Sequence, residues 1–249
     1  MPRGVREKSE TGIYHIIVRG INRQDIFLED EDKVQYLNRI LGCRKAYGVK
    51  VFAYCLMSNH VHLLMQEGRE DISATMKRVG VSYVYWYNQK YGRSGHLFQD
   101  RYISEPVEDD TYFLAALRYI HQNPVKIGLS IDNWTSYQDY ISNSKAEVDV
   151  DFAMGLFGDN INEFIAFMAT ETNTNQFIDE SIATKVTDKT AKSIITEVLN
   201  SSNTEFVQKL QEYNREARDE ALKTMKMRGL SVRQIARLTG INRGLIQKA

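Results

Sequence analysis

The chain has 249 residues, 43% of them hydrophobic and 26% charged, so it can bury the core of one large domain or two modest ones. Its formal net charge of zero excludes a uniformly basic or acidic protein. The polar first ten residues lack the apolar segment of a secretory signal, and no apolar run approaches the roughly 20 residues of a membrane helix. Because Cys43 and Cys55 also fit no metal-binding spacing, we expect a cytoplasmic protein with reduced thiols.

The first 140 residues alternate between strand patterns and helix patterns. Runs of β-branched and aromatic residues predict strands over 13–19, 49–56, 61–66 and 97–107. Apolar residues at helical spacing predict helices over 30–48, 71–87 and 110–123. The order β-α-β-β-α-β-α predicts an α+β fold of ferredoxin-like type, in which an antiparallel sheet carries helices on one face.

The most informative motif is the His60-Val61-His62 triplet at the start of the third predicted strand. Alternate residues of a strand point the same way, so the two imidazoles share one face of the sheet. Two imidazoles on a rigid strand form a platform for a divalent metal ion that needs one or two further ligands. The alternative, two buried polar residues in a core, is costly because both rings would need hydrogen-bond partners.

A second motif lies at the end of the helix predicted over 110–123. Tyr119 and Asn123 are four residues apart and therefore share a helix face, and Pro124 ends the helix. An amide oxygen is an acceptable ligand for Mg²⁺ or Mn²⁺. If this helix lies against the histidine strand, Asn123 joins the two histidines as a third ligand. Taken alone, Tyr119 would be interpreted as an ordinary core aromatic.

This combination of groups has a specific chemical use. A tyrosine phenol has a pKa near 10 and is a poor nucleophile at neutral pH. Its attack on a phosphodiester becomes feasible when a metal ion withdraws charge from the phosphate oxygens and holds phosphorus in line with the phenol. The phosphotyrosine product retains the phosphodiester bond energy, so a 3′-hydroxyl can reverse the step without ATP.

Beyond residue 140 the composition changes. Ser, Asn, Asp and Gly are frequent over 142–162, so we predict a first domain over 1–143, an acidic linker over 144–180 and a helical DNA-binding region over 181–249. The net charges of 1–140, 141–180 and 181–249 are +1, −7 and +6. A basic end favours an anionic partner such as nucleic acid, although basic helix faces are also common without one. The helices predicted here span 160–169, 189–199, 205–227 and 232–239, followed by a last short helix.

The segment 231–249 has the spacing of a helix-turn-helix. Ser231 and Asn242 can each cap a helix, Gly240 supplies the turn, and the small Ala236 lets the two helices approach. A small helical bundle without a DNA role is the alternative, since such spacings also arise by chance. The residues that would contact duplex DNA from the second helix are Arg243, Gln247 and Lys248.

Together these motifs resemble those of the single-tyrosine HUH transposases, and most closely the REP-associated tyrosine transposases. Four separated segments carry the resemblance in the expected order: 14–20, 60–62, 98–102 and 119–125. The resemblance covers about residues 10–141. It implies a ferredoxin-like catalytic domain, dependence on Mg²⁺ or Mn²⁺, and cleavage of single-stranded DNA through a 5′-phosphotyrosine. It assigns the nucleophile to Tyr119 and the metal ligands to His60, His62 and Asn123.

Other residues carry weaker predictions. The remaining histidines, His15, His96 and His121, are expected to be hydrogen-bonded or exposed rather than to bind a metal. Aromatic residues over 83–91 have the character of base-stacking residues, but their helical spacing requires at least half of them to lie in the core. Residues near strand ends are predicted to contact phosphate or a DNA hairpin, although surface arginines need no functional reason: Arg19, Asn22, Arg23, Gln99 and Arg101.

The sequence therefore predicts a metal-dependent endonuclease and strand transferase that acts on single-stranded or hairpin DNA as a monomer or homodimer. One alternative is a non-cleaving DNA-binding regulator derived from a transposase, which would bind in a salt-sensitive way without a metal ion. Another is the same chemistry in replication initiation or plasmid transfer, which the absence of a P-loop motif disfavours.

Overall fold

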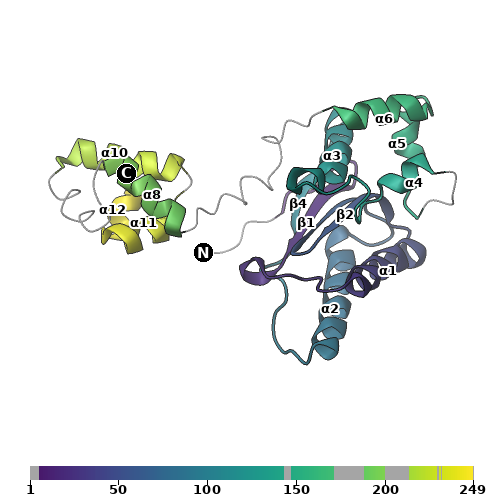
Figure 1. The fold of residues 1–249 in the computed structure, drawn as a ribbon, viewed down its shortest axis with the longest axis horizontal. Coiled ribbons are helices and arrows are strands. Elements are labelled where there is room, and N and C mark those ends of the chain that lie inside the picture. Colours follow the sequence, from purple (N-terminus) through teal and green to yellow (C-terminus); the bar gives the residue numbers. More distant parts are fainter. Residues whose placement is uncertain are drawn as a thin grey trace. The chain divides into compact units, whose positions relative to one another are not determined.

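The computed structural model of the chain describes residues 6–142, 147–170, 188–199, 213–228, 230 and 232–248. They fall into two compact units, within 1–174 and within 175–249 (Figure 1). In the ranges that are described, no helix combines the length and the apolar character needed to cross a membrane.

A four-stranded antiparallel sheet forms the centre of the first unit (Figure 1). The strands lie in the order β2-β3-β1-β4, so that β1 pairs with both β3 and β4. β2 and β3 form a hairpin whose turn is Ser58-Asn59, as predicted. The strand bounds are Ile13–Arg19 for β1, Lys50–Met57 for β2, His60–Gln66 for β3 and Ile103–Pro106 for β4.

Helices cover both faces of this sheet. α1 (Asp30–Tyr47) and α2 (Ile72–Lys90) pack against each other on one side, while α3 (Asp110–Gln122) lies on the other side and contacts β2 and β3 (Figure 1). The predicted α+β fold is thus confirmed. Helices α1 and α2 share one face of the sheet, as expected, whereas α3 lies on the opposite face, which was not expected. Six consecutive residues of β1 are buried, so neither face of this strand is exposed to water. A layer of helices must therefore cover each face of the sheet.

β4 is shorter than the strand predicted over 97–107. Phe98 forms only an isolated bridge with Gly20, and the Leu97 carbonyl accepts a hydrogen bond from the Ile21 amide at 2.9 Å. This part of the chain therefore supports the loop after β1 instead of continuing the sheet.

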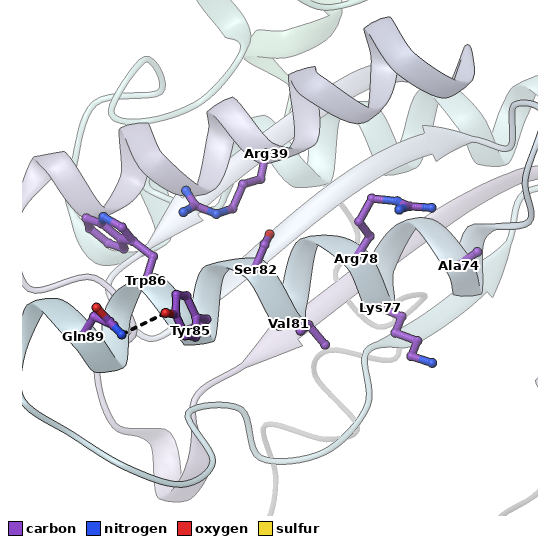
Figure 2. Close-up of a pocket in the computed structure, with 9 residues that line it drawn as sticks. All are labelled: Arg39, Ala74, Lys77, Arg78, Val81, Ser82, Tyr85, Trp86 and Gln89. Carbon is purple, nitrogen blue, oxygen red and sulfur yellow. Dashed lines mark hydrogen bonds between the residues drawn. The ribbon is translucent and has the colours of Figure 1, made fainter.

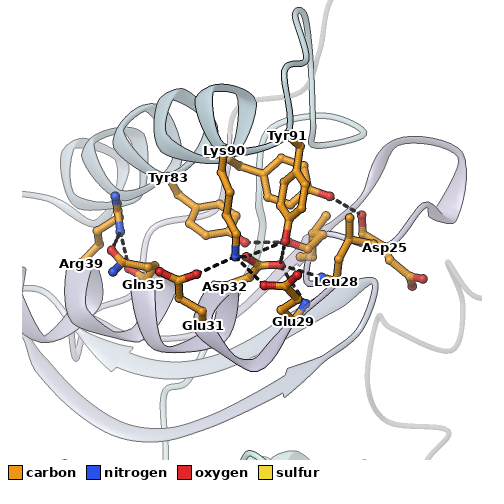
Figure 3. Close-up of polar contacts among 12 residues, drawn as sticks. Asp25, Leu28, Glu29, Glu31, Asp32, Gln35, Arg39, Tyr83, Lys90 and Tyr91 are labelled. Atoms are coloured by element: carbon orange, nitrogen blue, oxygen red, sulfur yellow. Dashed lines mark hydrogen bonds and ion pairs between the residues drawn. The ribbon is translucent and has the colours of Figure 1, made fainter.

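The start of α1 is bound to the end of α2 by a buried carboxylate (Figure 3). Asp32 is fully buried and accepts hydrogen bonds from the Leu28 amide at 2.7 Å and the Glu29 amide at 3.0 Å. Lys90 Nζ lies 2.8 Å from Asp32 Oδ1, and the Tyr91 hydroxyl donates to Oδ2 at 2.9 Å. Burial alone would raise the pKa of the Asp32 carboxyl, but these hydrogen bonds hold it below its ordinary value. Farther along the two helices, Arg39 of α1 lies beside Trp86 of α2 (Figure 2).

Replacing Asp32 by asparagine is expected to lower the free energy of unfolding by about 3 kcal/mol, because the amide nitrogen cannot accept the hydrogen bonds that one carboxylate oxygen receives, and Lys90 loses its buried anionic partner. The pKa of Asp32 is lower in the folded than in the unfolded chain, so its stabilisation is present above the unfolded value near 4 and is lost as the pH falls through the folded value. Urea titrations at neutral and acidic pH measure both effects. The exposed Asp30→Asn is the control, with an expected change within roughly 0.5 kcal/mol.

Among the described residues, the first unit also contains the short α-helices α4, α5 and α6. Phe164 of α6 is buried and stacks on Tyr140 of α4 with ring centroids 4.8 Å apart. Residues 147–170 therefore pack with the first unit, while the predicted domain boundaries at 143 and 180 stay predictions. The bounds are Tyr137–Ile141 for α4, Asp151–Gly155 for α5 and Ile161–Ala169 for α6.

The second unit is helical. Its described helices surround a buried core that includes Ile195, Leu222 and Ile246. The helix predicted over 205–227 begins at Arg215 in the structure, and 205–212 lie outside the described residues. The bounds are Asp188–Leu199 for α8, Arg215–Met227 for α10, Val232–Thr239 for α11 and Arg243–Lys248 for α12.

The turn between α11 and α12 has the predicted geometry. Gly240 has φ +73°, a left-handed conformation that favours glycine, and Asn242 Oδ1 accepts a hydrogen bond from the Gly244 amide at 2.8 Å. Arg243 and Gln247 are exposed, whereas Ser231 and the side chain of Lys248 lie outside the described part. The contact of this segment with DNA stays a prediction.

Candidate active site

His60 and His62 lie on the face of β3 that is turned toward α3. Their ring centroids are 5.1 Å apart and the rings are nearly perpendicular. His62 is fully buried, and His60 is partly exposed at the end of the strand. Burial lowers the pKa of His60 to about 4, assisted by the charges of Arg19 and Lys126. Burial also holds the pKa of His62 well below its usual value, so both rings are neutral at physiological pH and able to bind a metal ion.

Two further residues, His15 and Glu105, complete a buried hydrogen-bonded chain. His15 Nε2 lies 3.1 Å from His62 Nδ1, and His15 Nδ1 lies 2.9 Å from Glu105 Oε2. The sheet register explains the contact, because His15 of β1 is directly opposite Glu105 of β4 and diagonal to His62 of β3. His15 is hydrogen-bonded, as predicted, whereas its link to His62 was not predicted.

This chain determines which nitrogen of His62 carries the proton. An ionised Glu105 can only accept, so His15 donates through Nδ1 and is left with an acceptor at Nε2. His62 must then donate through Nδ1, which places its lone pair on Nε2. The neighbouring carboxylate thus sets both the orientation and the tautomer of His62, which is the arrangement that supports a metal-binding imidazole.

Tyr119 of α3 lies against these histidines. Its ring centroid is 5.6 Å from that of His62 and 5.8 Å from that of His15, with edge-to-face geometry in both contacts. Lys126 Nζ lies 3.9 Å from the centroid of the Tyr119 ring, and the side chain of Tyr119 is fully buried. The predicted tyrosine and the predicted His62 are therefore neighbours.

Asn123 follows Tyr119 by one helical turn and is the C-cap residue of α3, as Pro124 predicts. Its side chain is 6% exposed, and its Nδ2 atom donates to the Tyr119 carbonyl at 2.9 Å. Because the nitrogen is used in this hydrogen bond, Oδ1 is the atom that can serve as a ligand.

The donor set suits a hard or borderline divalent ion. Two neutral imidazoles and an amide oxygen are ligands that Mn²⁺ accepts readily and Mg²⁺ accepts less readily. Throughout the described ranges, no group of three or more His, Cys, Asp and Glu side chains is arranged to hold a metal ion. An ion on His60 and His62 would thus need amide or substrate oxygens, which leaves coordination positions open to a phosphate.

The predicted DNA contacts separate into two groups. Arg19 is the cross-strand neighbour of His60, and the Asn59 side chain of the adjoining turn donates to the Arg23 carbonyl at 3.3 Å. Asn22 lies in the same loop, and the backbone N–H of Gln99 donates to the Arg19 carbonyl at 2.9 Å. These four residues therefore gather at the end of the sheet that carries His60. Arg101 instead lines a cavity with Tyr14 and Ser104, which lie on the opposite face of the sheet.

Sequence comparison adds to this geometry. A family model for IS200-like transposases matches residues 8–123, the stretch that contains β1 to β4, both histidines and Tyr119. Residues 8–123 are therefore similar to the IS200-like transposases. A Haemophilus influenzae protein described as a REP-associated tyrosine transposase is 26% identical to the chain over 161 residues, which cover 57% of this chain and 88% of the relative. The predicted resemblance of the chain to the REP-associated tyrosine transposases is thus confirmed.

Two solved structures are also similar to the chain. One is a REP-associated tyrosine transposase bound to a REP hairpin, with 18% identity over 60% of this chain and 93% of that chain and a TM-score of 0.48. The other, a transposase from Deinococcus radiodurans, has 18% identity over 52% of this chain and 98% of its own, with a TM-score of 0.33.

Proposed function

We propose that this protein is a metal-dependent endonuclease and strand transferase, which cuts single-stranded or hairpin DNA through a 5′-phosphotyrosine on Tyr119. The observation that carries the proposal is the direct contact between Tyr119 and His62. A phenol in a transposase domain has no evident structural need for two neutral imidazoles and a buried carboxylate beside it, whereas phosphoryl transfer uses all of them.

The metal ligands in this proposal are His60, His62 through Nε2, and Asn123 through Oδ1. A bound Mg²⁺ or Mn²⁺ ion would withdraw charge from the non-bridging phosphate oxygens. Glu105 and His15 keep the lone pair of His62 on Nε2, where it would be available to such an ion.

Tyr119 performs the covalent step. Its oxygen forms a bond to phosphorus while the bond from phosphorus to the 3′ oxygen breaks, and the phenol proton passes to solvent as the 3′ oxygen takes one up. The ammonium of Lys126 and the guanidinium of Arg19 act near this ring, where positive charge favours the phenolate and the phosphate alike. Attack by a 3′-hydroxyl on the phosphotyrosine reverses the step and joins DNA.

DNA would reach the site across the end of the sheet that carries Arg19, Asn22, Arg23 and Gln99, where phosphate contacts are proposed. The exposed Arg243 and Gln247 of α12, with Lys248, are proposed to contact duplex DNA separately. Supporting this division of tasks, the exposed Arg243 begins the helix that follows the left-handed turn at Gly240.

Covalent capture tests the proposal. The full chain is mixed with a 3′-end-labelled hairpin oligonucleotide in the presence of Mn²⁺ or of EDTA, and the products are separated on a denaturing gel. A label that migrates with the protein only when Mn²⁺ is present is the expected result. Tight, salt-sensitive binding without any adduct would instead favour a non-cleaving regulator.

A further inference from the structure

A groove of about 980 Å³ lies along α1 and α2 and is separate from the candidate active site (Figure 2). None of its lining residues belongs to the histidine and tyrosine cluster, since α1 and α2 cover the other face of the sheet. Arg39 contributes from α1, and α2 contributes a row of side chains that includes Lys77, Val81 and Tyr85.

The groove carries positive charge. Arg39, Lys77 and Arg78 line it, and no lining residue is a carboxylate. Arg78 forms an ion pair with Glu70 at 2.9 Å. Arg39 instead donates a hydrogen bond to Gln35, and its guanidinium carbon lies 5.6 Å from the centroid of the Trp86 ring. Considering only the part of the chain that the structure describes, neither Arg39 nor Lys77 forms an ion pair with a carboxylate. A half-buried guanidinium without an anion favours an anionic ligand.

The same groove exposes aromatic and apolar surface. Tyr85 is 68% exposed and Val81 is 64% exposed, although both are large apolar side chains. The Tyr85 hydroxyl accepts a hydrogen bond from Gln89 at 3.0 Å, which holds the ring in place along α2 (Figure 2). An exposed ring beside cationic side chains is the combination that binds unpaired nucleic-acid strands, because every base has a face that can stack.

The length of the row indicates the size of the ligand. Lys77, Val81 and Tyr85 are spaced four residues apart and therefore follow one side of α2. At about 1.5 Å per residue this row extends roughly 12 Å, which exceeds a single base and suits a short run of nucleotides.

We propose that the groove along α1 and α2 binds single-stranded DNA, with phosphates on Arg39 and Lys77 and a base stacked on Tyr85. An acidic peptide would satisfy the cations but would leave the exposed ring without a role. The proposal goes beyond the cleavage reaction, since binding here requires neither Tyr119 nor a metal ion, so either proposal can fail alone.

Photocrosslinking locates the strand directly. The full chain carrying Tyr119→Phe is irradiated in EDTA with an oligodeoxythymidine of about 20 nucleotides that contains 5-bromodeoxyuridine, and tryptic peptides are analysed by mass spectrometry. The expected adduct lies in the peptide 79–90, which contains Tyr85 and Trp86. Adducts confined to other peptides, or displacement of the DNA by polyglutamate as readily as by unlabelled DNA, would overturn the proposal.

Affinity provides the second measurement. The double variant Lys77→Glu and Tyr85→Ala changes two exposed side chains and is expected to weaken binding of the oligonucleotide about tenfold, with a salt dependence reduced by about one phosphate contact. The control is Lys45→Glu, which makes the same charge change at an exposed position of α1 outside the groove. Equal affinity of the double variant and the control would contradict the assignment.

Discussion

Replacing Tyr119 by phenylalanine is expected to reduce covalent capture of DNA at least about a thousandfold, because the variant keeps the ring and loses only the attacking oxygen. The ring contacts with His62 and His15 and the contact with Lys126 are preserved, so DNA binding and the thermal unfolding midpoint should change little. Quantifying labelled DNA bound to the protein on a denaturing gel in Mn²⁺ measures the effect.

Tyr47→Phe is the matched control for this experiment. It removes a hydroxyl from a tyrosine at the end of α1, on the other side of the sheet from Tyr119, and leaves its ring beneath Arg78. Its adduct yield should equal that of the wild type. If Tyr119→Phe forms as much adduct as the control, another residue is the nucleophile and the proposed mechanism is wrong.

The second large effect, on metal binding, is expected at His15, which is hydrogen-bonded to His62 but is not itself a proposed metal ligand. His15→Phe removes the acceptor that fixes the Nδ1 proton of His62, so the Nε2 lone pair is no longer enforced. We expect the affinity for Mn²⁺, measured by isothermal titration calorimetry in the absence of DNA, to fall 10–100-fold. The readout is independent of catalysis, so it separates metal binding from cleavage.

Two variants make this result interpretable. His15→Gln retains a side-chain oxygen that can accept from His62 and should lose less affinity than His15→Phe. His121→Phe removes another fully buried histidine, which is hydrogen-bonded to Ser136 at 2.8 Å, and should leave Mn²⁺ binding unchanged. An unchanged affinity in His15→Phe, with the fold verified by circular dichroism, would show that the Glu105 chain has no part in metal binding.

Much of this arrangement is encoded locally in the sequence. The two-residue spacing of His60 and His62 fixes their common face once the segment is a strand, and the four-residue spacing of Tyr119 and Asn123 fixes theirs once the segment is a helix. The positions of Pro124 and Gly240 likewise determine the end of α3 and the turn before α12.

The features of the site that could not be predicted depend on contacts between segments that are distant in the sequence. His15 meets Glu105 and His62 only because β1 lies between β3 and β4, an order that no local pattern contains. Lys126 follows Pro124 in a short turn, so its position over the Tyr119 ring depends on how that turn folds back. The second helical layer was not predicted for the same reason, since burial of both faces of β1 becomes evident only when α3 is in place.

The burial of Tyr119 beneath Lys126 has a consequence for the proposed reaction. The side chain of Tyr119 has no exposed surface and the ammonium group of Lys126 lies over its ring, so solvent has no access to the proposed nucleophile in this structure. The ammonium group of Lys126 interacts more strongly with a phosphodiester than with the face of an aromatic ring. A bound DNA strand would therefore move Lys126 away from the Tyr119 ring. The Tyr119 hydroxyl would then become accessible only when the DNA strand that is to be cut is bound. Other electrophiles in solution would not reach it.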